Sequence, residues 1–237
     1  QPLCSLQFLC EQLKLEKTLL STAFYEENKN RTIDHLQEIF TDNQVSILRL
    51  LGHKKKALPP AQFSKLAEAI LTVSLGSFEE PGIKNVFPGA CNRPNAIYIS
   101  GMHRIFVCPS LLSYPDLTLQ QILAHELGHV IQRMQDYVPC FYGYPKSQRD
   151  EVFADWVASK VLAEKISSEK NKKIAGKQAF ESQLLFLNLA CGNVQKIKPK
   201  WNNTHPNLQN RVEHIFLSQP AFQEALRCHS KYLRTCG

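Results

Sequence analysis

Two histidines and a glutamate within five consecutive residues offer the clearest chemistry in this sequence. His125 and His129 are four residues apart, and Glu126 follows the first of them directly. On a helix, residues i and i+4 project from one face, so both imidazoles can reach a single metal ion. Glu126 would lie beside that ion, where it can take a proton from a water molecule. The pattern H-E-x-x-H is typical of zinc hydrolases, mostly proteases.

The flanking residues predict that this pattern lies within one amphipathic helix, over 117–134. Apolar residues recur there at helical spacing, namely Leu119, Ile122, Leu123, Leu127, Val130, Ile131 and Met134. Asp116 or Thr118 would serve as the N-cap. Gly128 is unusual in this position, since glycine costs a helix interior about 1 kcal/mol relative to alanine. We therefore expect another part of the chain to approach closely at Gly128.

A second helix, predicted over 148–166, offers a third metal ligand. The segment from Ser147 to Asp150 resembles a capping box, with Asp in place of the usual Glu or Gln. Glu151 and Asp155 follow, four residues apart, and share one helix face. Two carboxylates at this spacing repel each other slightly without a cation, which favours a metal site. Glu151 would bind the ion, and Asp155 would accept a hydrogen bond from the second ring nitrogen of a ligand histidine.

The order of these motifs resembles that of the gluzincins, in particular the HtpX and CAAX prenyl protease family of zinc metalloproteases. In that family H-E-x-x-H is followed by E-x-x-A-D, as it is here on the second helix. The segment 95–107 resembles the family's N-A-F-x-x-x-G-G-x-I-x-V segment, a hairpin before the zinc helix. Downstream, T-H-P around His205, with Arg211 beyond it, resembles the family's H-P-x-x-x-x-R segment. The resemblance covers residues 95–211 and does not extend to the first 90 residues or the last 20.

The resemblance implies a zinc-dependent endopeptidase with a zincin-like core. One Zn²⁺ ion per chain would be held by His125, His129 and Glu151, with water in the fourth position. Glu126 would be the general base that activates this water for attack on a peptide carbonyl, and it would return the proton to the leaving amine. The substrate would be a protein or a peptide.

The same resemblance gives His205 a role, and other residues are candidates through their positions. His205 would donate to the oxyanion of the reaction, or it would be a fourth zinc ligand that holds a latent state. Arg211 would pair with Asp155 and fix its position. Tyr142 and Tyr144, between the two ligand helices, are weaker candidates for the oxyanion donor.

Two other classes of function stay open. A zinc amidase that acts on cell-wall peptides would suit a basic protein of an oxidising compartment. A non-catalytic, chaperone-like binding protein could retain the metal site, but it would have no need of the base Glu126.

Around these motifs the sequence predicts a mainly α (α+β) fold in a single metalloprotease domain of 237 residues. Within it we expect a helical N-terminal region over 1–90, a catalytic core over 91–217 and a C-terminal helix over 218–237. Helical spacing of apolar residues favours helices over 3–28, 32–52, Pro60 to about Gly76, 117–134, 148–166, 174–190, 207–217 and 220–234.

A small β-hairpin is predicted before the first ligand helix. Its strands would cover 96–100 and 104–108 around Gly101, after a loop over 79–94 that is rich in Pro, Gly and Asn. The exposed edge of such a hairpin could pair with an extended peptide and align it over the metal.

Charge and hydropathy restrict the partners. Apolar stretches are interrupted by charge well before the roughly 20 residues that span a bilayer, so we expect no transmembrane segment. This departs from the membrane members of the family and argues against substrates within the bilayer. The net charge of +7 favours peripheral association with anionic surfaces. The charge is diffuse and forms no nucleic-acid motif.

Eight cysteines predict disulfide bonds. No two form a C-x-x-C pair, which argues against a structural zinc knuckle. An even number of cysteines favours an oxidising compartment, and we expect a periplasmic or secreted protein. The local pairs that we expect are Cys91 with Cys108 and Cys228 with Cys236.

Two further features suit a secretory route. The chain begins with Gln rather than Met, as it would after removal of a signal peptide. Asn30 and Asn202 lie in N-x-T acceptor patterns for glycosylation, which matter only in a eukaryotic secretory pathway.

Overall fold

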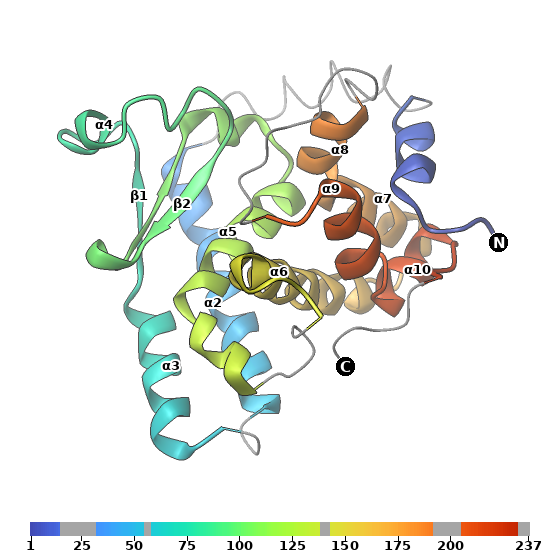
Figure 1. Cartoon of the computed structure of the whole chain (residues 1–237). Helices are drawn as coiled ribbons and strands as arrows, with labels where there is room; N and C mark the ends of the chain where they lie inside the picture. The colour runs from blue at the N-terminus through green and yellow to red at the C-terminus, as the bar shows by residue number, and fades with distance from the viewer. Residues whose placement is uncertain (15–31, 55–57, 138–142, 192–204, 232–237) are drawn as a thin grey trace.

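A computed structural model describes residues 1–14, 32–54, 58–137, 143–191 and 205–231 of the chain (Figure 1). Helices dominate it and its sheet is small, so the expected mainly α (α+β) class is confirmed. The helices are a first helix over 6–14, α2 (Ile33–His53), α3 (Pro60–Thr72), α4 (Ile83–Val86), α5 (Asp116–Val130), α6 (Arg149–Ser168), α7 (Lys172–Ser182), α8 (Leu184–Cys191), α9 (Leu208–Asn210) and α10 (Pro220–Leu226).

Helix α5 lies between the two sides of the molecule. The sheet and α3 lie on one side of it, and α7 to α10 lie on the other (Figure 1). The helix packs against α2, α6, α7 and β2, and nearly every side chain from Leu117 to Gly128 is buried. A helix that is enclosed in this way can hold polar side chains away from bulk water, which strengthens their electrostatic interactions.

Gly128 is the point at which α6 comes close to α5. A Cβ atom at this position would lie 2.7 Å from the Cα atom of Ala154 and 3.1 Å from its Cβ atom. The close approach expected from the sequence is therefore present. Gly128 stands between the two histidines in the sequence and faces Ala154 of α6. It therefore sets the distance between the two helices that carry the candidate metal ligands.

The three-stranded sheet has the order β1-β3-β2. Strands β2 (Ala96–Ile99) and β3 (Arg104–Val107) pair in antiparallel fashion, with Ala96 opposite Val107, so the predicted hairpin is confirmed. Strand β1 (Ser74–Ser77) pairs with β3 in parallel, with Ser74 opposite Arg104. Strand β2 is thus an edge of the sheet.

The helix predicted from Pro60 to about Gly76 is shorter in the structure, because α3 ends at Thr72 and β1 follows it. The strand is held by pairing with residues some 30 positions later, which local spacing does not reveal. A side chain at Gly76 would clash with an ion pair, since a Cβ atom there would lie 2.8 Å from Nε of Arg104 and 2.8 Å from Oε1 of Glu80. The glycine therefore makes room for the two 2.8 Å hydrogen bonds between these side chains.

The predicted helix over 174–190 is two helices, which break at Gln183. The hydroxyl of Thr118 on α5 donates a 2.6 Å hydrogen bond to the carbonyl of Glu181, near the end of α7. This tertiary contact accompanies the break. The start of α7 at Lys172 is set by Asn171, whose side chain accepts hydrogen bonds from two backbone N–H groups of the first turn.

Two other expectations about helix ends, the N-cap of α5 and the end of the C-terminal helix, were wrong. The N-cap of α5 is Pro115, and Asp116 instead lies 2.8 Å from His35. Helix α6 begins at Arg149, with Gln148 as its N-cap and no cap hydrogen bond from the Gln148 side chain. The C-terminal helix ends at Leu226 rather than 234. Beyond it the chain turns back to the N-terminus.

Three disulfides join the described residues: Cys4–Cys228, Cys10–Cys191 and Cys91–Cys108. The pairing of Cys91 with Cys108 agrees with the prediction, whereas Cys228 bonds to Cys4 and not to Cys236. The reason is tertiary, because Leu3 and His229 form a β-bridge that brings the two ends of the chain together. Cys140, Cys236, residues 15–28 of the helix predicted over 3–28, and the acceptor residues Asn30 and Asn202 lie outside the described residues.

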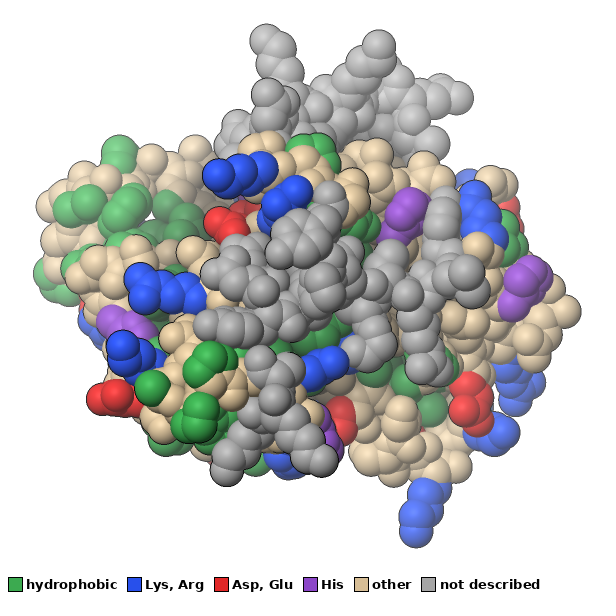
Figure 2. Space-filling view, turned by 60° about the horizontal axis from the view of Figure 1, so that its bottom comes forward, with side chains coloured by type: hydrophobic (Ala, Val, Ile, Leu, Met, Phe, Trp, Pro, Cys, Tyr) green, Lys and Arg blue, Asp and Glu red, His purple; other side chains and the backbone are tan. Residues whose placement is uncertain are grey.

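No described helix has both the length and the apolar character to cross a bilayer. Lys and Arg side chains occur at several separate places on the face in Figure 2, with Asp and Glu side chains between some of them. This distribution agrees with a diffuse positive charge.

Candidate metal centre

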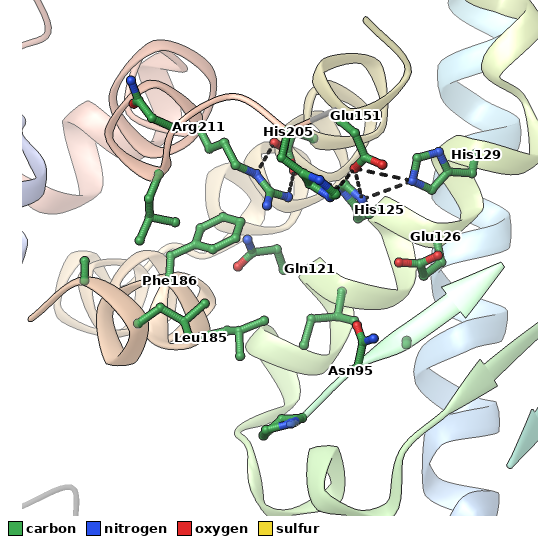
Figure 3. Close-up of a pocket in the computed structure, with 18 of the residues that line it drawn as sticks. Asn95, Gln121, His125, Glu126, His129, Glu151, Leu185, Phe186, His205 and Arg211 are labelled. Atoms are coloured by element: carbon green, nitrogen blue, oxygen red, sulfur yellow. Dashed lines mark hydrogen bonds and ion pairs between the residues drawn. The ribbon is translucent and has the colours of Figure 1, made fainter. Parts of the chain in front are cut away.

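Four side chains meet at one point above α5 (Figure 3). The Nε2 atoms of His125 and His129 are 3.2 Å apart. Oε2 of Glu151 lies 3.3 Å from the Nε2 atom of His125 and 3.7 Å from that of His129. The Nε2 atom of His205 lies 3.0 Å from the same oxygen. Three imidazole nitrogens thus surround one carboxylate oxygen.

These side chains come from three segments. His125, Glu126 and His129 lie on α5, and they form a group that could hold a metal ion. Glu151 is in the first turn of α6. His205 precedes α9. The close packing of α5 on α6 at Gly128 brings the first two segments together.

The Glu151 carboxylate has the character of a metal ligand. Its Oε2 atom is buried and makes no hydrogen bond of acceptable geometry, although three ring nitrogens are near. Burial would raise the pKa of Glu151, but the contacts with His125 and His205 hold it well below its usual range. An ionised buried oxygen without a hydrogen bond leaves a lone pair for a cation.

The separations also fit a tetrahedral site. Zinc binds imidazole nitrogen and carboxylate oxygen at about 2.0–2.2 Å, so neighbouring ligand atoms in a tetrahedron are about 3.3–3.6 Å apart. The observed separations of 3.0, 3.2, 3.3 and 3.7 Å fall around these values. The donor set, imidazole with carboxylate, is one that zinc prefers.

A buried ion pair orients the first histidine. Nδ1 of His125 donates a 2.8 Å hydrogen bond to Oδ1 of Asp155, which leaves Nε2 directed to the meeting point. Arg211 donates two 2.7 Å hydrogen bonds to Asp155 through Nε and Nη2. Burial would raise the pKa of Asp155, but Arg211 and His125 lower it to about 2. Asp155 is therefore a fixed negative charge behind the His125 ring.

The two imidazoles differ electrostatically. Burial acts to lower the pKa of His125, but Asp155 and Glu151 outweigh it and raise the pKa to about 10. Burial and the charge of His125 lower the pKa of His129 to about 4, so His129 is neutral at pH 7 with a lone pair available. A cation at the meeting point would replace the proton on His125 and neutralise the nearby carboxylates.

Glu126 occupies a different position from Glu151. Its Oε2 atom accepts a 2.7 Å hydrogen bond from the backbone N–H of Tyr98 on β2. Burial raises the pKa of Glu126 to about 7, against the opposing effects of His125 and the Tyr98 N–H. The carboxyl group can therefore exchange a proton near neutral pH, as a general acid or base must.

The centre opens into a large cleft. The cleft volume is about 2720 Å³, whereas small-molecule pockets are typically about 300–1,000 Å³. One wall is the edge strand β2, and the opposite wall is α8 with the first helix. Residues of the two walls include Asn95, Ala96, Ile97, Tyr98, Leu6, Cys10, Leu185, Phe186 and Leu189. A cleft of this size has room for an extended chain.

Other predicted residues are not part of this arrangement. Tyr144 is not among the residues that line the cleft, and Tyr142 lies outside the described residues. The Tyr98 N–H was not among the predicted site groups, because a backbone donor carries no residue signature. Gln121, Leu185 and Phe186 were not predicted either. For Gln121 a signal existed, since a polar residue one turn before His125 shares its helix face.

Comparisons of the chain with protein-family models, with curated proteins and with solved structures give no match. The interpretation of the site therefore depends on its geometry and on the motifs of the sequence.

Proposed function

We propose that this protein is a zinc-dependent endopeptidase. The observation that carries the proposal is the buried Oε2 atom of Glu151, which lies 3.0–3.7 Å from the Nε2 atoms of three histidines without a hydrogen bond. When bound at this point, a zinc ion would lower the pKa of a water molecule and polarise the carbonyl oxygen of a substrate.

The ligands that we propose are His125, His129 and Glu151. Glu126 is also close enough to contribute to a metal group. Its Oε2 atom is, however, held by the Tyr98 N–H, whereas Oε2 of Glu151 faces both imidazoles. The geometry therefore favours Glu151 as the ligand and leaves Glu126 for proton transfer.

Glu126 is the proposed general base. Its second oxygen, Oε1, makes no hydrogen bond with the described residues, and Glu126 lines the cleft. The Tyr98 N–H fixes the carboxylate without occupying Oε1. Glu126 would take a proton from the attacking water and pass it to the amine that leaves. Burial raises the pKa of Glu126 to about 7, which makes its carboxylate a stronger base than an exposed glutamate.

His205 has two possible roles within this proposal. Its Nε2 atom is 3.0 Å from Oε2 of Glu151, which would suit a fourth metal ligand. A third of its side chain is exposed, so it could also turn and donate to an oxyanion. The two roles predict opposite effects of removing the imidazole, as described below.

A peptide is the substrate class that the cleft favours. Strand β2 is an edge strand, and its residues line the cleft beside Glu126. An extended peptide can add to such an edge through main-chain hydrogen bonds. The three disulfides support an oxidising compartment, so we propose that the protein acts in the periplasm or after secretion.

The proposal is tested by metal analysis and peptide digestion. The purified protein should hold about one zinc per chain, and it should cleave members of a peptide library in a reaction that a chelator stops. Glu151→Ala should lose both zinc and activity. Glu164→Ala is a matched control on the exposed side of α6, where Glu164 pairs with Arg49, and it should keep both. Absence of zinc from the wild-type protein, with no cleavage after zinc is added, would refute the proposal. Cell-wall peptides in the same library would detect an amidase.

A further inference from the structure

Gln121 presents an unused amide to the cleft. It lies on α5 one turn before His125 and lines the cleft with it. Only 2% of its surface is exposed, and its Oε1 atom is buried without a hydrogen bond. Figure 3 shows the carboxamide pointing toward Phe186. An amide that is buried without a partner weakens folding, and a ligand group that pairs with it would restore the lost hydrogen bond.

The location sets Gln121 apart from other buried amides. Among the described residues, carboxamide oxygens without a partner are also found on Asn43, Gln120, Gln178 and Gln183. None of these four lines the cleft. Gln121 therefore combines an unsatisfied, buried polar atom with a place in the wall of the proposed active site, as does Glu151.

Apolar side chains form part of the cleft wall near the amide. Ile122 and Phe186 are buried beside it in the cleft wall, and Leu185 is half-buried. The guanidinium carbon of Arg211 lies 4.7 Å from the centre of the Phe186 ring, but its charge is balanced by Asp155. A charged group that entered this space would lose part of its hydration, and the Arg211 guanidinium is already paired with Asp155.

We propose that Gln121 forms a subsite for a glutamine or asparagine side chain of the substrate, immediately beside the scissile bond. This inference rests on the proposed peptidase function. Residues four apart on a helix are about 6 Å apart at Cβ, so a side chain next to the bond held at His125 can reach Gln121.

A carboxamide is the complement that this space requires. When the two amides lie antiparallel, it donates an N–H to Oε1 of Gln121 and accepts one from Nε2. Because the substrate amide can turn by 180°, it can match either orientation of the Gln121 amide. Its methylene groups would contact Leu185 and Phe186. A methionine or leucine side chain would fill the same volume but leave the Gln121 amide without a partner.

The test compares peptides that differ only in Gln or Met at one position next to the scissile bond. The wild-type protein should prefer Gln over Met by about 10- to 100-fold in kcat/KM, the penalty for a buried amide left without a partner. In Gln121→Met the preference should vanish or reverse. Gln120→Met is a matched control, because Gln120 is the adjacent buried residue but does not line the cleft. It should keep the wild-type preference.

Binding provides a second readout that does not need turnover. The affinities of fluorescein-labelled Gln and Met peptides for the Glu126→Gln protein, and for Glu126→Gln with Gln121→Met, should show the same change of preference. If zinc-dependent cleavage occurs but its Gln-to-Met ratio is the same with and without Gln121, the subsite is refuted and the peptidase stands. An equal loss of affinity for the Gln and Met peptides in Gln121→Met would also refute the subsite, because Gln121 would then bind the peptide backbone. If cleavage is absent but the binding preference depends on Gln121, the peptidase is refuted and the subsite stands. No binding preference and no cleavage would refute both.

Discussion

Replacing Gly128 by alanine tests how the fold sets the metal site. The new Cβ atom would lie 2.7 Å from the Cα atom of Ala154 and 3.2 Å from its carbonyl oxygen. Carbon atoms normally approach to about 3.5–4.0 Å, so α5 and α6 must separate by roughly 1 Å. The obstacle is backbone, which has no alternative rotamer. Even removal of the Ala154 side chain would leave the contact with its Cα atom.

The magnitude follows from two opposing effects. Alanine favours a helix interior over glycine by about 1 kcal/mol. Overpacking of a core typically costs about 1–3 kcal/mol, and the rigid backbone contact places this case at the upper end. We therefore expect Gly128→Ala to lower the free energy of unfolding by about 2 kcal/mol. Because the shift also moves Glu151 away from His125 and His129, zinc affinity should fall by about 10-fold or more.

Urea unfolding followed by circular dichroism measures the first effect. It should be carried out with a chelator present, so that loss of bound metal does not contribute. Gly52→Ala is the control, because no atom lies within 4 Å of a Cβ at this position near the end of α2. Its stability should equal or exceed that of the wild type. If Gly128→Ala is as stable as the wild type and binds zinc equally well, the close contact of α5 and α6 is not what positions the site.

Three other variants have defined outcomes. Asp155→Asn should weaken zinc binding by about 10- to 100-fold. It should also lower the free energy of unfolding by about 3–5 kcal/mol, because it leaves the buried Arg211 guanidinium without its counter-charge. A zinc affinity and a urea unfolding curve like those of the wild type would contradict this. His205→Ala should reduce kcat by about 100- to 1,000-fold with zinc retained if it is the oxyanion donor, and should raise kcat if it is a blocking fourth ligand; no change in either quantity removes it from the site. The double variant Cys4→Ser/Cys228→Ser should lower the free energy of unfolding by about 4 kcal/mol. With Cys10–Cys191 intact, the loop that Cys4–Cys228 closes has about 40 residues, and the estimate follows from this loop length. A thermal unfolding midpoint within 2 °C of the wild type would show that the Cys4–Cys228 bond is dispensable.

The grouping of side chains at the candidate metal centre was open to prediction because it lies in local spacing. His125 and His129 share a helix face by their separation alone, and the apolar residues around them identify the helix. Gly128 stood out because it is unfavourable in a helix interior, and the structure places Ala154 against it. The relation between Glu151 and Asp155 is similarly local.

Features that depend on distant contacts could not be found in this way. Strand β1 has four residues, and it exists through pairing with β3. The bond of Cys228 to Cys4 spans 224 residues, and no spacing rule links them. The Tyr98 N–H that holds Glu126 is a backbone group, which any residue would supply. The orphaned amide of Gln121 became apparent only once its neighbours were known.

The most direct test of the central claim is the turnover of Glu126→Gln, measured on protein whose zinc content is determined in the same sample. This change keeps the shape of the side chain and the hydrogen bond from Tyr98 but removes the carboxylate that accepts the proton. We predict about one zinc per chain and a value of kcat lower than that of the wild type by about 100- to 10,000-fold. Wild-type turnover by the zinc-loaded variant, or loss of the zinc together with activity, would contradict the assignment of Glu126 as the base of a zinc peptidase.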